Sequence, residues 1–363
     1  MFCRRDYLNT RLLYRVKESP RKERKLHYLV TGHTGFKGSW LVLMLNQLGH
    51  EVSGIALDPV NNSLFYSAKI RKKMSFDERC DLRDVKRLNK KIQKIAPDVV
   101  IHLAAQPLVR KSYANPRETI ETNAIGTFNV LEAVSKIPSV KANLIITTDK
   151  VYKNVNQKKG YVESDHLGGD DPYSASKAMA DIATQSFIKS FPGVPTAIAR
   201  AGNVIGGGDV SEDRLIPDLI KGFIKQKPVL IRYPSAVRPW QHVLDCLNGY
   251  LILVDKMLNN KVKGEWNFGP DEKSFKDVKT VADYLKNRWG QGASWSTDEK
   301  ENPHEAELLA LDATKAETQL NWHNKLSFEE TLDWTLDWHK AVEDGVSPLE
   351  QTQVQIKKFR EMN

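Results

Sequence analysis

Two short stretches bring together side chains that can move protons. TTDKVY, residues 147–152, follows the apolar run ANLII and places Thr148, Asp149 and Lys150 side by side. An apolar run of this kind predicts a buried parallel strand, and open α/β sheets bind their ligands at the carboxyl ends of such strands. A hydroxyl, a carboxylate and an ammonium at that point therefore indicate a catalytic site. The competing interpretation is a solvated ion pair between Asp149 and Lys150.

The second stretch, DPYSASK, places Tyr173 four residues before Lys177, on one face of an expected helix. An ammonium beside a phenol stabilises the phenolate, so we expect Lys177 to lower the pKa of Tyr173 toward neutrality and make it a base. Of the 11 tyrosines, Tyr173 is the one with Lys at that spacing. The isolated motif is more typical of a surface pair, but a strand-end hydroxyl at Thr148 favours catalysis.

These residues need a sheet to position them, and the sequence from residue 26 predicts one. The expected strands are LHYLVTG (26–32), EVSGIALD (51–58), DVVIHLAA (98–105), ANLIITTD (142–149) and VPTAIARAGNVIG (194–206), with one more before CDLRD. Apolar strands alternating with helices predict a doubly wound parallel α/β sheet of the Rossmann type, covered on both faces. The alternation stops near residue 208, where we expect a smaller mixed α/β lobe to begin.

A glycine-rich turn joins the first expected strand to the first helix. VTGHTGFKGSW spaces Gly32, Gly35 and Gly38 as GxxGxxG. Glycines here let the backbone turn tightly and approach a pyrophosphate, whose charge a helix N-terminus favours. His33 and Lys37 lie within the turn and are candidates to contact the cofactor phosphates. Three glycines can also form a tight turn that binds nothing.

Acidic residues after the second and third strands favour a dinucleotide. Asp58 ends the second expected strand, 26 residues after Gly32. A carboxylate at this point accepts hydrogen bonds from a ribose diol and repels a 2′-phosphate, which predicts NAD rather than NADP. Asp81 either contacts the adenine or caps the following helix.

Composition limits the classes of function. The 363 residues are 40% hydrophobic and 27% charged, without an apolar run long enough to cross a bilayer. Of the net charge of +9, residues 1–25 carry +6, from nine Lys and Arg against three acids. The remaining +3 argues against nucleic-acid binding by the folded body. Cys3, Cys80 and Cys246 are far apart and odd in number, so neither disulfides nor a metal site are indicated, and a reducing cytoplasm suits them.

These patterns divide the chain into three parts. Residues 1–25 are either a disordered extension or a weak transit peptide, and we expect the first. Residues 26–208 are expected to form the NAD-binding domain. Residues 209–363 would be mainly a substrate-binding lobe, with some segments returning to the sheet. The junction of two such lobes is a usual place for a small-molecule pocket.

Longer blocks carry a family resemblance. The glycine turn, Thr148 and the Tyr173–Lys177 pair resemble those of the extended short-chain dehydrogenase/reductases. Within these, the chain is similar to the CDP-glucose 4,6-dehydratases over roughly residues 26–358. The blocks that carry this similarity are GHTGFKGSWL, HLAAQPLVR, DPYSASK, RAGNVIGGGD, DRLIPD, VRPWQHVL, WNFGPD and PHEA.

The resemblance implies an intramolecular redox reaction on CDP-glucose, in the synthesis of deoxysugars for surface polysaccharides such as lipopolysaccharide O-antigen. Tyr173 would take the proton of the sugar 4-hydroxyl while NAD⁺ accepts the C4 hydride, with Thr148 and Lys177 holding the geometry. The new ketone acidifies the C5 proton, water leaves across C5 and C6, and NADH returns its hydride to C6.

Asp149 and Lys150 stand where such dehydratases carry the acid and the base for water loss. An acid needs a raised pKa and a base a lowered one, whereas adjacent opposite charges shift each pKa the other way. Which residue is the acid and which the base therefore stays open.

Further ligand contacts follow from the motifs and the resemblance together. For the cofactor they are Gly32, His33, Gly35, Phe36, Lys37, Gly38, Asp58, Asp81, Leu82, Ala104, Gln106, Asn123, Tyr173 and Lys177. For the substrate they are Gln106, Arg110, Asn203, Arg214, Arg238, His304 and Glu305. Arginine suits the diphosphate because its planar guanidinium matches phosphate oxygens. Relatives commonly pair through the helix that holds Tyr173, so we expect a homo-oligomer, either a dimer or a tetramer.

Two alternatives stay open. The first is a nucleotide-sugar 4-epimerase, or a 4,6-dehydratase acting on another nucleotide, because the choice of base rests on resemblance alone; Asp149 and Lys150 argue against epimerisation. The second is a non-catalytic NAD-binding or nucleic-acid-associated protein that uses the basic segment. The Tyr173–Lys177 pair and the small charge of the folded body argue against it.

Overall fold

The structure, a computed structural model, describes residues 25–157, 159–191, 193–260, 262–298 and 309–362. Its centre is a sheet of seven parallel strands in the order β3-β2-β1-β4-β5-β6-β10. The strands are β1 (His27–Thr31), β2 (Glu51–Ala56), β3 (Phe76–Arg79), β4 (Val99–His102), β5 (Ala142–Ile146), β6 (Thr196–Ala201) and β10 (Gly264–Phe268). The order reverses between β1 and β4, so the predicted doubly wound Rossmann sheet is confirmed.

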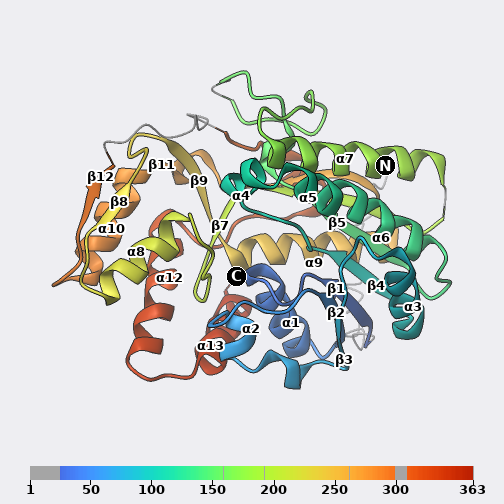
Figure 1. Ribbon diagram of the computed structural model, residues 1–363, viewed down its shortest axis with the longest axis horizontal. Coiled ribbons are helices and arrows are strands. Elements are labelled where there is room, and N and C mark those ends of the chain that lie inside the picture. The colour runs from blue at the N-terminus through green and yellow to red at the C-terminus, as the bar shows by residue number, and fades with distance from the viewer. Residues whose placement is uncertain (1–24, 158, 192, 261, 299–308, 363) are drawn as a thin grey trace, which may run out of the picture.

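Helices cover both faces of this sheet, which is why its strands are apolar on both sides (Figure 1). Consecutive residues of β1 show the division, since Leu29 packs into one core cluster and Val30 into the other. The cluster of Val30 includes side chains of α1 (Phe36–Gln47), α9 (Val243–Asn260), α11 (Thr314–Leu320), α12 (Phe328–Glu343) and α13 (Pro348–Glu361). The cluster of Leu29 includes side chains of α3 (Val85–Ile95) and α6 (Gly126–Ser135). On this second face α7 (Pro172–Ser190) packs beside α6 and crosses β6 and β10.

Short turns and helices complete the connections of the sheet. They are α2 (Leu64–Ser67), η1 (Ile70–Lys73), α4 (Val109–Ala114), α5 (Pro116–Ile120), η2 (Glu121–Ile125) and η3 (Asp149–Val151). Of these, α4 and α5 pack against α7, so they help to position the helix that carries Tyr173.

A smaller lobe has its own core beside the carboxyl end of the sheet (Figure 1). It contains a three-stranded sheet, β11-β9-β7, and a two-stranded sheet, β12-β8. The strands are β7 (Asn203–Ile205), β8 (Val229–Ile231), β9 (Val237–His242), β11 (Phe275–Asp277) and β12 (Trp295–Thr297). Helices α8 (Leu215–Ile224) and α10 (Val278–Trp289) pack against these strands, and η4 (Glu272–Ser274) precedes β11. The predicted smaller mixed lobe is therefore present.

The last predicted strand, residues 194–206, is two strands in the structure. The chain leaves the large sheet at Gly202, and β7 pairs with β9 of the small lobe instead. The seventh strand of the large sheet is β10, which comes from the GEWNF stretch. A side chain at Gly202 would be tightly packed, because a Cβ there would stand 3.1 Å from the Asp149 carboxylate and 3.2 Å from Pro239.

The structure also bears on the expectations about membrane-spanning helices, cysteines and the basic segment. Within the described segments, no helix combines the length and apolar character needed to cross a bilayer. Cys80 and Cys246 are buried free thiols, while Cys3 lies outside the described residues. The basic segment, residues 1–25, also lies outside them apart from Lys25.

Candidate active site

The end of β5 forms a tight turn that gathers the first catalytic candidates. The strand stops at Ile146, and Thr148 caps the η3 turn that follows, its Oγ1 accepting the backbone N–H of Lys150 at 3.4 Å. The Thr148 hydroxyl also donates to Oδ1 of Asp149 at 2.8 Å. Asp149 is only 6% exposed, whereas Lys150 is half-buried. Three neighbours in sequence thus form one hydrogen-bonded unit beyond the carboxyl end of β5.

Burial decides the direction of the Asp149 pKa. Desolvation raises it, and this outweighs the opposing effects of the Lys150 charge and the Thr148 hydrogen bond. A raised pKa is the direction that the acid of a proton-transfer pair needs. The charge of Lys150, which the sequence shows, predicts a lowered pKa for Asp149. The burial that raises this pKa is not visible in the sequence.

Helix α7 presents the second pair of candidates. Asp171 caps it by accepting the backbone N–H of Ser174 at 3.0 Å, and Pro172 occupies the first turn, as a helix start favours. The backbone N–H of Tyr173 donates to Ser112 of α4 at 3.1 Å. Lys177 lies on the buried face of α7, and its Nζ donates to the backbone oxygen of Ile146, the last residue of β5, at 2.8 Å.

The expected effect of Lys177 on Tyr173 is not seen in the protein alone. The Tyr173 phenol is hydrogen-bonded to the Thr148 hydroxyl, but burial raises its pKa to about 12. Lys177 is not among the groups that lower that pKa; its own pKa falls to about 7 through burial and the nearby charge of Lys37. The correction has a physical reason: a buried ammonium loses hydration, so its charge is too costly to secure a phenolate. The Arg214 charge favours the phenolate, and so does the Thr148 hydroxyl when its one proton turns from Asp149 to the phenol.

The glycine turn fits the backbone of a dinucleotide cradle. Gly32 has φ +72°, and a Cβ there would stand 2.7 Å from the backbone of Ala104. At Gly38 a Cβ would stand 2.3 Å from the Gly32 oxygen. Gly35 is exposed and precedes α1 without a side-chain cap, so the first N–H groups of α1 are available to a phosphate. The residues present therefore fit NAD.

His33 lies underneath this turn rather than facing a ligand. Its side chain is fully buried, its Nε2 is 2.7 Å from Oδ1 of Asp77, and its ring packs edge-on against Phe65. Gly54 of β2 makes room for the ring, since a Cβ there would lie 2.2 Å from it. The His33 side chain is therefore not accessible for the expected contact with the cofactor phosphates.

The two predicted acidic contacts are both held by arginines. The Asp58 side chain is 90% exposed beyond the end of β2 and accepts from Nε of Arg79 at 3.1 Å. Asp81 accepts from the backbone and the guanidinium of Arg83. The helix-capping alternative for Asp81 is wrong, because Asp84 caps α3. Contact with the adenine is thus the interpretation of Asp81 that stays open.

Several predicted contacts already have partners within the chain. Gln106 and Asn123 are buried, with the backbone N–H of Gln106 donating to Asn123 Oδ1 at 2.7 Å and the Asn123 amide donating to Ser176 of α7 at 2.9 Å. The Gln106 amide donates to Thr119 and Leu108. Leu82 is buried as well. Gln106 and Asn123 thus hold the loop after β4 against α7.

Phe36 and Lys37 are the first two residues of α1. The Lys37 ammonium lies 3.5 Å from the Tyr250 hydroxyl of α9, and burial lowers its pKa. The charges of Asp149 and Arg214 also act on it, which places it near the catalytic turn. Phe36 is half-buried and packs beside Gly206.

Arginines from three segments approach the expected substrate side. Arg238 of β9 is buried, and its charge acts on Asp149, as that of Arg214 acts on Tyr173. Arg110 of α4 is exposed and pairs with Asp213 at 2.7 Å, which links the two lobes. Asn203 begins β7, next to Gly202. His304 and Glu305 lie outside the described residues.

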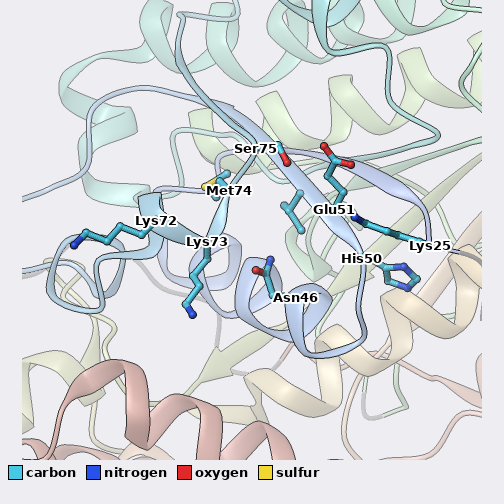
Figure 2. A pocket seen from close by; sticks show the side chains of 9 residues that line it. Lys25, Asn46, His50, Glu51, Lys72, Lys73, Met74 and Ser75 are labelled. Carbon is cyan, nitrogen blue, oxygen red and sulfur yellow. The ribbon is translucent and has the colours of Figure 1, made fainter.

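A separate hollow of about 450 Å³ lies at the opposite edge of the sheet (Figure 2). It is lined by Lys25, Asn46, His50, Glu51, Val52, Lys72, Lys73, Met74 and Ser75. These residues precede or begin strands, whereas parallel sheets bind ligands where strands end. The hollow is therefore not part of the candidate active site.

A buried ion pair beside the candidate catalytic residues was not predicted from the sequence. Arg200 of β6 and Asp181 of α7 are both fully buried and paired at 2.7 Å. Two signals could have found them: a lone arginine inside the apolar strand TAIARA, and an acid four residues after Lys177 on the same helix face.

Fold and site together define an extended short-chain dehydrogenase/reductase of the nucleotide-sugar dehydratase class. A family model described as GDP-mannose 4,6 dehydratase matches residues 29–335. Because that match covers most of the chain, the protein belongs to this family.

Comparison with individual proteins shows which members of the family the chain is similar to. The chain is 45% identical to a CDP-glucose 4,6-dehydratase of Salmonella typhimurium strain LT2, over 86% of this chain and 90% of that protein. It is 26% identical to a dTDP-glucose 4,6-dehydratase of Haemophilus influenzae, over 86% of this chain and 98% of that one.

Solved structures share the fold. A UDP-glucuronic acid 4-epimerase from Bacillus cereus, in complex with UDP-glucuronic acid and NAD, is 25% identical with a TM-score of 0.76, over 87% of this chain and 100% of that chain. A dTDP-glucose 4,6-dehydratase from Bacillus anthracis, in complex with NAD, is 24% identical with a TM-score of 0.74, over 89% and 99%.

Proposed function

We propose that this chain catalyses the NAD-dependent dehydration of CDP-D-glucose to CDP-4-dehydro-6-deoxy-D-glucose. The observation that carries the proposal is the 45% identity to a CDP-glucose 4,6-dehydratase across nearly the whole of both chains. The buried Asp149 beside Lys150 supports it chemically, because water loss needs an acid and a base that a 4-epimerase does not need.

NAD would lie along the glycine turn, with its pyrophosphate at the N-terminus of α1 near Gly35. Asp58 would accept hydrogen bonds from the adenine ribose, and Asp81 would contact the adenine. When bound, NAD would take up a hydride from C4 of the sugar and return it to C6. Residues 26–208 would form most of this cofactor site, and residues 209–363 most of the substrate site.

The chain's own residues would handle the protons. Tyr173 would accept the proton of the 4-hydroxyl, with Thr148 hydrogen-bonded to the phenol and Lys177 held behind it by the Ile146 carbonyl. Asp149, whose pKa burial raises, would give a proton to the departing 6-hydroxyl. Lys150 would then be the base at C5. Arg214 and Arg238 would neutralise the diphosphate, with Arg110 and Asn203 at its edge.

The chain would act as a homo-oligomer in the cytoplasm. Ile125, Phe128, Met179 and Ile182 of the helices around α6 and α7 are large apolar side chains, each between 43% and 54% exposed. Apolar groups gathered on adjacent helices favour burial against another subunit.

A panel of CDP-, UDP-, GDP- and dTDP-glucose, each incubated with the protein and NAD⁺, tests the proposal. We expect a 4-keto-6-deoxy product, detected by its absorbance in alkali, with CDP-glucose and at least about tenfold less with the others. A C4 epimer as the sole product from CDP-glucose would sink the dehydratase proposal. Ketone formation with another nucleotide alone would correct the base and keep the reaction.

A further inference from the structure

The buried pair Asp181 and Arg200 joins the two segments that carry the catalytic candidates. Both side chains are 0% exposed. The guanidinium of Arg200 donates to the Asp181 carboxylate from Nε at 2.9 Å and from Nη2 at 2.7 Å. A planar two-point contact of this kind sets orientation as well as distance.

Each member of the pair reaches a residue next to a catalytic one. Asp181 accepts from the hydroxyl of Thr147 at 3.0 Å, and Thr147 directly precedes Thr148. Nη1 of Arg200 donates to the Tyr152 hydroxyl at 2.7 Å, and Tyr152 follows the η3 turn that holds Asp149 and Lys150. The pair therefore holds the catalytic turn on both of its sides.

The same pair is anchored to α7 one turn beyond Lys177. Because Lys177 donates to Ile146 while Asp181 accepts from Thr147, two successive turns of α7 contact two successive residues at the end of β5. Sliding or rotating α7 against β5 would break both contacts. The distance between Tyr173 and the Thr148–Asp149 unit thus depends on this double attachment.

Stability alone is a poor reason for such a pair. Removing two charges from water costs about as much as their attraction returns, and apolar residues of similar size often serve stability equally well. Here the polar atoms are nevertheless well partnered: Gln185 donates to Asp181 at 2.9 Å, and the Tyr152 hydroxyl donates to Asn267 of β10 at 2.8 Å. A satisfied buried network of this kind specifies one arrangement of the elements that it joins.

We propose that Asp181 and Arg200 are positioning residues that keep Tyr173 and Lys177 of α7 in register with Thr148, Asp149 and Lys150 of the β5 turn. The inference rests on the proposed function, since it gives the pair a part in the same reaction. Neither residue touches substrate. Their loss would misplace catalytic groups by a fraction of an ångström to about an ångström, an error that can lower rate up to about a hundredfold while binding is little changed.

The test compares Asp181→Asn with a matched control, Asp333→Asn. Asp333 of α12 also accepts two bonds from one arginine, Arg288 of α10, at 2.9 and 2.8 Å, but this pair joins α12 to α10 and does not contact β5 or α7. Steady-state rates are measured per NADH-binding site, well below the melting temperature of each variant. We expect Asp181→Asn to lower kcat about tenfold to a hundredfold, with KM and the NADH Kd within about twofold of wild type. Asp333→Asn should change none of the three.

A merely structural role predicts a different pattern, in which Asp181→Asn lowers the melting temperature and the number of binding sites but leaves kcat per site unchanged. That result would overturn the inference. If Asp181→Asn does not fold, the near-isosteric variant Thr147→Val provides the test. We expect it to lower kcat about fivefold at unchanged KM. A kcat equal to that of wild type would overturn the inference. The substrate is whichever nucleotide sugar the wild-type protein converts, so failure of the proposed function is seen separately, in the wild-type panel.

Discussion

At the scale of single residues, burial sets the properties of the proton-handling groups. It raises the pKa of Asp149, lowers that of Lys177 to about 7 and raises that of Tyr173 to about 12. In each case the shift disfavours the charged form, as desolvation does. The Tyr173 phenol therefore keeps its proton at neutral pH, whereas Lys177, with a pKa of about 7, readily gains or loses one there.

Asp149→Asn should separate the two halves of the reaction. The amide keeps the size of the carboxyl but cannot give its proton to the departing hydroxyl, so we expect the 4-keto-6-deoxy product to form about a hundredfold more slowly. C4 oxidation should persist, seen as NADH absorbance when substrate is added. Tyr173→Phe is the matched control: it should abolish NADH formation with little change in substrate affinity. Undiminished water loss by Asp149→Asn would remove this residue from the mechanism.

At the scale of elements, the turn between β1 and α1 shows why each glycine is needed. Gly32 and Gly38 lie where a Cβ would collide with backbone atoms at 2.7 and 2.3 Å. Gly35 differs, because its φ of −80° suits any residue and a Cβ would meet only the Gly32 oxygen, at 3.4 Å. Gly32 and Gly38 are therefore required by the fold, whereas Gly35 is not, and in the proposed function it would leave space for the pyrophosphate.

Alanine at Gly38 should lower stability, whereas alanine at Gly35 should lower the affinity for NADH. Gly38→Ala forces the turn to move, so we expect a loss of about 2 kcal/mol or more in the free energy of unfolding. Gly35→Ala should melt within about 2 °C of wild type yet bind NADH at least about tenfold more weakly, because the methyl group would occupy the pyrophosphate cradle. Thermal melts and NADH fluorescence titrations measure both effects. Equal NADH affinity in Gly35→Ala and wild type would place the cofactor elsewhere.

At the scale of the whole molecule, buried histidines link stability to pH. Burial lowers the pKa of His102 and His242 to about 3 and that of His339 to about 4, from an ordinary value of 6.5. Below pH 6.5 the unfolded chain binds protons that the folded chain refuses, so stability falls as the pH falls toward 4. Asp245 acts oppositely, since burial raises its pKa to about 7 and the folded chain then binds the extra proton. Burial also raises the pKa of Asp149, Glu163 and Asp218 and lowers that of His33. We expect the large shifts of the three histidines to outweigh the carboxyl groups and to leave the protein less stable in acid.

We expect the melting temperature to fall steadily from pH 6.5 to pH 4.5, and His242→Asn to flatten that fall. Nδ1 of His242 accepts the backbone N–H of Leu244 at 3.2 Å, and an asparagine oxygen can accept the same bond without titrating. Each histidine contributes up to about 1.4 kcal/mol per pH unit in this range. An identical slope in the variant and in wild type would show that His242 does not remain neutral in the folded state.

Local patterns were enough to predict the Rossmann sheet, the glycine turn, the capped helix of Tyr173 and the polar segment that follows β5. They succeed because apolar runs, glycine spacing and helix caps act over a few neighbouring residues. The departure of β7 from the large sheet was not predicted, since Gly202 matters only through Asp149 and Pro239 across the fold. The partner of His33 was likewise out of reach, because Asp77 lies 44 residues away.

By itself the sequence determined which chemical groups are present and which element carries each of them. Only the tertiary structure decided how those groups behave. It buries Asp149 deeply enough to raise its pKa, turns Lys177 toward a backbone carbonyl, and brings Arg200 against Asp181 behind both. The physical reason is that desolvation and pairing depend on atoms brought together from distant parts of the chain, whereas residue type and spacing are properties of the chain before it folds.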